Sequence, residues 1–166
     1  MSLLPLLLAP VAAQGIWPTR ARQELVISDS ALASQVGAAI MRKGGNAIDA
    51  AIATGFALAV TFPAAGNIGG GGFMLVRMAD GRQVAIDFRE IAPASATKNM
   101  YLDKAGNVIS RLSLDGYKAS GVPGTVAGMW EAHRRFGKLA WKELVEPARK
   151  LAADGYEVSY DFAGSL

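Results

Sequence analysis

The sequence predicts a mixed fold of α-helices and a β-hairpin, and three observations support this prediction. Helix-forming stretches open and close the chain, at residues 31–43, 47–62, 121–136 and 141–153. Between them, two apolar runs flank an Asp80-Gly81 turn, a strong short-range signal for a hairpin. With 166 residues, of which 51% are hydrophobic and 19% charged, the chain can form one packed core.

Composition and charge exclude several classes of function. The formal net charge is +3, and the 17 basic residues are scattered, so no basic stripe for nucleic acid is expected. The absence of cysteine excludes disulfides, thiolate nucleophiles and cysteine-type zinc sites. The single histidine, His133, lies in a polar helical stretch and is expected to be solvated. A His-based metal site or a Ser-His-Asp triad therefore lacks the residues it needs.

The amino end resembles part of a secretory signal. Residues 3–13 are apolar, but a bilayer span needs roughly 20 such residues, so no stable membrane span is expected. Val11 and Ala13 occupy plausible cleavage positions, although the usual basic residues before the apolar run are missing. We therefore expect a signal-peptide remnant at 1–13, with a frayed apolar tail as the alternative. A linker at 14–25 and one incomplete domain at 26–166 are expected to follow.

The helix ends and the hairpin can be predicted from local residues. Gly44-Gly45 ends the first helix, and Asn46 with Asp49 forms a capping-box pattern at the start of the second. That second helix is apolar on all sides, which is typical of a buried helix. A short strand is expected at Val26-Ile27, and an irregular segment at 93–117. The hairpin strands, 73–78 and 83–89, are apolar on both faces, so helices on one side and a second sheet on the other are expected to cover them.

The loop Gly69–Gly72 has two interpretations. Glycine-rich loops bind phosphate when a strand precedes them and a helix follows, so that backbone N–H groups face the anion. Here a helix precedes the loop and a strand follows, and no Gly-Lys-Ser/Thr sequence is present. The local order favours a tight backbone crossing where a side chain would not fit. An anion-binding module that uses this loop is the alternative.

Arg89 is the candidate binding residue. It follows an apolar strand, which is a rigid support, and a guanidinium there can hold a carboxylate through two parallel hydrogen bonds. The neighbouring acids Asp87 and Glu90 allow another interpretation, in which they pair with Arg89 and hold it in place. The local pattern by itself favours this pairing over substrate binding and over an acid/base role for the two acids.

Seven segments in order resemble the start of the γ-glutamyltransferase (glutathione hydrolase) family, over about residues 26–158. They are Leu32–Gly37, Gly44–Ala51, Gly66–Met74, Ile86–Pro93, Ser113–Gly116, Gly121–Gly128 and Phe136–Trp141. Each segment is weak evidence by itself, but seven in the family's order are specific. Ser28-Asp29-Ser30 departs from the pattern, since many relatives carry a histidine before the Leu-Ala-Ser stretch.

The resemblance implies an α+β fold of the N-terminal-nucleophile hydrolase type, a four-layer αββα sandwich of which this chain is the N-terminal part. It implies a periplasmic or secreted proenzyme that cleaves itself into a large and a small subunit. A threonine at the start of the small subunit would accept the γ-glutamyl group of glutathione or a related compound. The group would then pass to water or to an amino acid or peptide. No metal or organic cofactor is implied.

Within this resemblance, Arg89 matches the arginine that binds the α-carboxylate of the glutamyl group. No threonine of this chain lies in the nucleophile's motif, and Ser30, Ser34 and Thr125 are interpreted as turn, cap or helix-start residues. The chain alone is therefore expected to be inactive, with its small subunit as partner. An acylase of the same family, acting on the side-chain amide of a β-lactam, is the closest alternative.

Overall fold

The computed structural model describes Pro18 and residues 20–164. Within them lie five α-helices, one short 3-10 helix and a two-stranded sheet, so the predicted mixture of helix and sheet is confirmed. The proposed signal-peptide remnant at 1–13 lies outside the described residues. The described part of the proposed linker holds no helix or strand, and the boundary of the domain at residue 26 stays a prediction.

The first two helices end and begin where the sequence predicts. Helix α1 (Ala31–Arg42) begins at Ser30, whose hydroxyl accepts the Ala33 N–H, and the chain leaves it through Gly44 at a φ of +94°. Helix α2 (Ala47–Thr61) begins at Asn46, and its capping box with Asp49 is confirmed. The left-handed conformation of Gly44 lets the chain reverse within two residues, so that α2 packs directly against α1.

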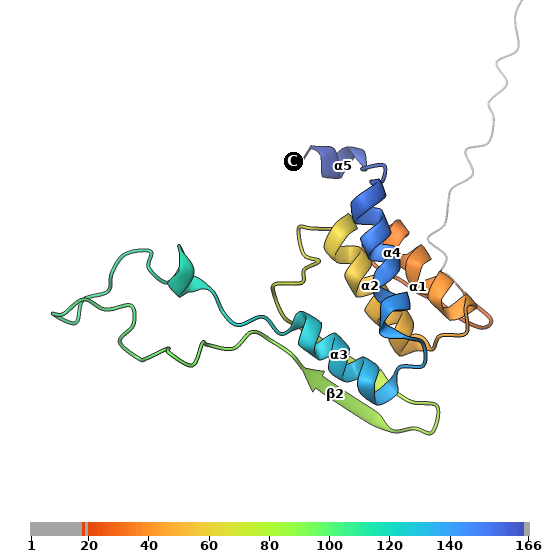
Figure 1. Ribbon diagram of the computed structural model, residues 1–166, viewed down its shortest axis with the longest axis horizontal. Coiled ribbons are helices and arrows are strands. Elements are labelled where there is room, and N and C mark those ends of the chain that lie inside the picture. The colour runs from red at the N-terminus through yellow and green to blue at the C-terminus, as the bar shows by residue number, and fades with distance from the viewer. Residues whose placement is uncertain (1–17, 19, 165–166) are drawn as a thin grey trace, which may run out of the picture.

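Helix α2 is the centre of the core. Figure 1 shows it beside α1 and α4 (Trp141–Asp154), with α3 (Thr125–Phe136) between α2 and the hairpin. Its fully buried side chains include Ile52 and Ala53, and Leu144 of α4 is equally buried. The prediction of a buried helix is therefore confirmed. A fifth helix, α5 (Tyr160–Ala163), was not predicted.

The hairpin pairs strand β1 (Phe73–Arg77) with strand β2 (Gln83–Asp87), antiparallel, in the register Phe73↔Asp87. One face carries the buried Val76 and Ile86 and joins the helical core. On the other face, Leu75 is 85% exposed, so helices cover one side as predicted, whereas the described residues form no second sheet on the other. The predicted strand at Val26-Ile27 is wrong for the described residues, where this segment is irregular and Val26 packs against Gly37 of α1.

An extended arm leaves the body between the hairpin and α3 (Figure 1). Single bridges, Ile91↔Val122 at its base and Leu102↔Val108 farther out, hold its two sides together, and a 3-10 helix, η1 (Tyr117–Ala119), lies on its return. The prediction of an irregular segment at 93–117 is confirmed. Of the described helices, none has the length and apolarity that a bilayer span requires.

Candidate substrate-binding site

Arg89 lies two residues after β2, at the base of the arm, and its backbone is held on both sides. The preceding Phe88 N–H donates to the Gly72 carbonyl at 3.0 Å, and the Arg89 N–H donates to a carboxylate oxygen of Asp87 at 3.0 Å. Two residues later, Ile91 and Val122 exchange backbone hydrogen bonds of 3.3 and 2.8 Å. The attachment point of this side chain is therefore fixed although the residue itself is exposed.

The Arg89 guanidinium makes no ion pair with any described residue. The interpretation that it pairs with its neighbouring acids is wrong, because Asp87 accepts the backbone N–H instead and Glu90 forms no ion pair with it. The contact that the guanidinium does make is with Phe73, whose ring centroid lies 5.9 Å from its central carbon. The guanidinium therefore lies against an aromatic ring, and its N–H groups form no ion pair with a described carboxylate.

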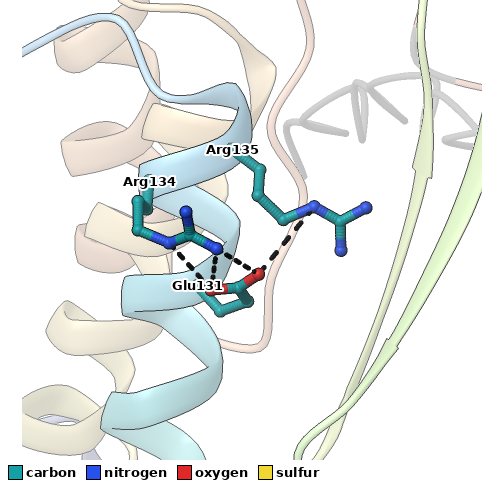
Figure 2. Close-up of polar contacts among 3 residues, drawn as sticks. All are labelled: Glu131, Arg134 and Arg135. Atoms are coloured by element: carbon teal, nitrogen blue, oxygen red, sulfur yellow. Dashed lines mark hydrogen bonds and ion pairs between the residues drawn. The ribbon is translucent and has the colours of Figure 1, made fainter.

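Two other arginines show the opposite arrangement. Figure 2 shows Arg134 and Arg135 of α3 converging on Glu131, with nitrogen–oxygen distances of 2.9 and 3.9 Å. Their charges are already compensated on an exposed helix face, and such surface pairs contribute only about 0–1 kcal/mol to stability. A second anion is bound less readily by a guanidinium that a carboxylate already holds. Unlike these two arginines, Arg89 has no carboxylate partner among the described residues, so its N–H groups can bind an anionic ligand.

The glycine loop packs against the segment that carries Arg89. A Cβ on Gly71 would lie 2.7 Å from the Arg89 Cα, and a Cβ on Gly72 would lie 3.0 Å from the Phe88 ring. None of the four glycines has a positive φ, so close approach rather than backbone conformation requires the small residue at position 71. This geometry supports the interpretation as a backbone crossing. Anion binding by the loop stays an alternative prediction.

The sequence did not reveal a polar contact that joins the loop to α3. The Thr125 hydroxyl, at the start of α3, donates to the Asn67 side-chain oxygen at 2.7 Å. Thr125 is 4% exposed, and the Gly70 N–H donates to the same Asn67 oxygen at 2.9 Å. Both residues stand in segments that the family resemblance covers, but 58 positions separate them. Only the predicted helix start at Thr125 could be inferred in advance.

His133 is not solvated, and that prediction is wrong. Its ring stacks on Trp130 and lies against Trp141, with centroid distances of 5.6 and 5.3 Å, and its Nε2 is 2.7 Å from the Leu139 carbonyl oxygen. The polar neighbours of His133 in sequence lie on other sides of α3, whereas α4 brings Trp141 to it. Among the described residues, no cluster of His, Cys, Asp and Glu has the arrangement of a metal site.

The comparisons with known proteins agree with this architecture. A family described as Gamma-glutamyltranspeptidase matches residues 33–166. A glutathione hydrolase proenzyme of Pseudomonas aeruginosa is 60% identical over 126 residues, which are 76% of this chain and 22% of that protein. The crystal structure of Helicobacter pylori γ-glutamyltranspeptidase superposes with a TM-score of 0.83 at 53% identity, covering 89% of this chain and 42% of that one. A cephalosporin acylase from Bacillus halodurans gives a TM-score of 0.74 at 31% identity, covering 94% and 30%.

The fold is thus α+β of the N-terminal-nucleophile hydrolase type, the four-layer αββα class, to which this chain contributes a hairpin and the helices on one of its faces. The chain belongs to the γ-glutamyltranspeptidase family. It spans about a fifth of the length of the Pseudomonas aeruginosa relative.

Proposed function

We propose that this chain is the N-terminal part of the large subunit of a glutathione hydrolase. The complete protein would transfer the γ-glutamyl group of glutathione and related compounds to water or to an amino acid or peptide. The family match over residues 33–166 and the proenzyme relative at 60% identity support this proposal. The threonine nucleophile and the oxyanion donors would belong to the small subunit produced by self-cleavage, so residues 1–166 alone would be inactive.

The observation that carries the proposal is the uncompensated guanidinium of Arg89 on a fixed backbone. A planar guanidinium presents paired N–H groups that match the two oxygens of a carboxylate. Phe73 lies against it at 5.9 Å, which restricts the orientations that the guanidinium can take. Arg89 would therefore bind the α-carboxylate of the γ-glutamyl substrate.

The part of the reaction assigned to this chain is binding and orientation. With its α-carboxylate held by Arg89, the substrate would extend toward the small subunit and present its γ-amide carbon to the nucleophile. Fixing a substrate in this way converts a bimolecular encounter into a step between groups already in place, and a misplacement of about 1 Å can cost about a hundredfold in rate. No proton transfer is assigned to residues 1–166.

The first experiment is to sequence the coding DNA beyond the Leu166 codon in the source genome. An open frame that leads to a threonine-initiated small subunit is expected. A stop codon after Leu166 with no small subunit encoded nearby would contradict the proposal. The proposal also includes export to the periplasm or the medium, which N-terminal sequencing of the mature protein would test, since cleavage after Ala13 is expected.

The second experiment replaces Arg89 in the full-length proenzyme. Arg89→Ala should raise the KM for a γ-glutamyl anilide by at least about thirtyfold, because losing one partner of a charged pair costs about 2–5 kcal/mol. The matched control is Arg77→Ala. Arg77 is also an exposed arginine, and it lies on the same face of β1 as Phe73, four residues farther along the strand. Its KM should stay within about twofold of the original. An Arg89→Ala enzyme with unchanged KM would refute the assignment.

Similarity to the cephalosporin acylase supports one alternative, an acylase that cleaves the side-chain amide of a β-lactam. A γ-glutamyl donor needs a group that binds its α-carboxylate, and Arg89 supplies one. The two functions differ toward a 4-aminobutyryl anilide, which lacks that carboxylate. The glutathione hydrolase should use this donor poorly, and Arg89→Ala should not make it worse. Efficient turnover of β-lactam side-chain amides that is insensitive to Arg89→Ala would favour the acylase.

A further inference from the structure

The backbone at Phe88 and Arg89 is enclosed by glycines from two other segments. On one side is Gly71 of the loop, where a Cβ would come within 2.7 Å of the Arg89 Cα. On the other side is the start of α3, where a Cβ on Gly124 would overlap the Phe88 carbonyl oxygen and one on Gly128 would overlap the Phe88 ring. Any change in the spacing between the loop and α3 would therefore be transmitted directly to the Cα of Arg89.

That spacing is set by a small group of hydrogen bonds between the loop and α3. The N–H groups of Gly124 and Thr125 both donate to the Gly70 carbonyl oxygen, at 2.8 and 3.0 Å. The Thr125 hydroxyl donates to the Asn67 side-chain oxygen at 2.7 Å, and the Gly70 N–H donates to that same oxygen at 2.9 Å. We call this group, formed by Asn67, Gly70, Gly124 and Thr125, the loop–helix clamp.

We propose that Thr125 and Asn67 are positioning residues for Arg89, acting through the loop–helix clamp. This inference rests on the proposed function, in which Arg89 binds the substrate carboxylate. The side-chain hydrogen bonds of both residues go to groups other than Arg89, so their effect would pass through the enclosed backbone. A bidentate contact tolerates errors of only about 0.5 Å and 10–20°. Loss of the clamp would therefore weaken carboxylate binding while the protein stays folded.

The loop–helix clamp depends on the hydrogen-bonding groups of two particular side chains, those of Asn67 and Thr125. The Asn67 oxygen accepts two hydrogen bonds, one from a side chain and one from the backbone, so it fixes Gly70 and Thr125 relative to each other. The Thr125 hydroxyl is buried with this acceptor as its partner, and a methyl group in its place would leave the distance between loop and helix without a polar restraint. Serine at position 125 would keep the hydrogen bond to Asn67, whereas valine would keep only the shape of the threonine side chain.

The test measures KM and kcat for a γ-glutamyl anilide with four variants of the full-length enzyme. Thr125→Val should raise KM about tenfold, whereas Thr125→Ser, which keeps the hydroxyl, should stay within about twofold of the original. Thr61→Val is the matched control, because Thr61 is also a buried threonine whose hydroxyl donates to a carbonyl, that of Ala57 at 3.0 Å, in a different part of the core. Its KM should not change.

The fourth variant, Arg89→Ala combined with Thr125→Val, separates positioning from general damage. If Thr125 acts through Arg89, adding Thr125→Val to Arg89→Ala should raise KM no further. An equal rise in both backgrounds, or a Thr125→Val enzyme with KM within twofold of the original, would overturn the inference. Arg89→Ala without effect would refute the proposed role of Arg89 in binding the substrate carboxylate, and the inference with it, so the two failures are distinguishable.

A second pair of variants does not depend on a buried substitution. Asn67 is exposed, so Asn67→Ala can be made without opening a cavity, and it removes the oxygen that Thr125 and Gly70 share. It should raise KM to the same extent as Thr125→Val, and Asn67→Asp, which keeps an acceptor oxygen at that position, should not. A KM for Asn67→Ala equal to that of Asn67→Asp would contradict the role of the clamp even if Thr125→Val did not fold.

Discussion

Replacement of the buried carboxylate of Asp49 should loosen the turn between α3 and α4. Asp49 is fully buried, and one of its oxygens accepts the Asn46 N–H at 3.0 Å in the capping box of α2. Its two oxygens also accept the Lys138 N–H at 3.0 and 3.2 Å, and one of them accepts the Leu139 N–H at 3.3 Å. One side chain thus starts α2 and holds a turn 89 positions away.

The isosteric change Asp49→Asn allows the magnitude to be worked out. Because the Lys138 N–H contacts both carboxylate oxygens, the new amide NH2 faces that N–H in either orientation of the side chain. The Lys138 N–H then loses one of its two acceptors, and the remaining bonds lose their charge assistance, for a total cost of about 2 kcal/mol. This cost corresponds to an equilibrium constant for local opening at Lys138 that is about thirtyfold larger.

Amide hydrogen exchange of the full-length protein measures this opening directly. The protection factors of Lys138 and Leu139 should fall about thirtyfold in Asp49→Asn. The control Asp115→Asn makes the same chemical change on an exposed carboxylate that pairs with Arg111 on the arm, and it should leave both amides unaffected. Protection at Lys138 that changes less than threefold in Asp49→Asn would refute the reasoning.

Two further predictions concern the loop and the arm. Gly71→Ala should raise the KM for a γ-glutamyl donor and lower the stability of the protein, because the new Cβ would lie 2.7 Å from the Arg89 Cα. The control Gly69→Ala, whose Cβ would have no atom within 4 Å, should behave as the original enzyme. The KM and the midpoint of urea unfolding measure both effects. On the arm, hydrogen bonds from Asn107 lower the pKa of Asp103 from its ordinary 3.8. The stabilisation of this turn is therefore complete above pH 3.8 and is lost as the pH falls through the lowered pKa. An NMR titration of the Asp103 carboxyl should have its midpoint below 3.8, and Asn107→Ala should move it upward.

Features set by neighbouring residues could be predicted from the sequence. The capping box needs only Asn46 and Asp49, three positions apart, and the hairpin needs only Asp80-Gly81 between two apolar runs. The end of α1 likewise follows from Gly44. In each case the hydrogen-bond partners lie within about one turn, so local chemistry determines the conformation.

Features set by distant residues could not be predicted. The sequence predicts Asp49 as part of a helix cap, but its second role depends on where the α3–α4 turn passes, which the sequence around Asp49 does not show. The charged neighbours of His133 predict a solvated ring, yet Trp141 on another helix determines its surroundings. The family pattern identifies Arg89 as a candidate binding residue. The neighbouring acids leave its guanidinium unpaired because of the directions in which their side chains point. The sequence Asp-Phe-Arg-Glu does not reveal these directions.

The arrangement around Arg89 reconciles two demands that usually conflict at a binding site. A side chain that must reach a substrate has to be exposed, and exposed arginines lose little freedom to their surroundings. In this chain the restraint is placed on the backbone instead, where Gly71 and Gly124 allow two segments to approach the Arg89 position within contact distance. Larger residues at those two positions would hold the segments apart and leave the arginine on a looser support. Gly71 and Gly124 are therefore as much a part of the proposed carboxylate site as the guanidinium, because they fix the backbone that carries it.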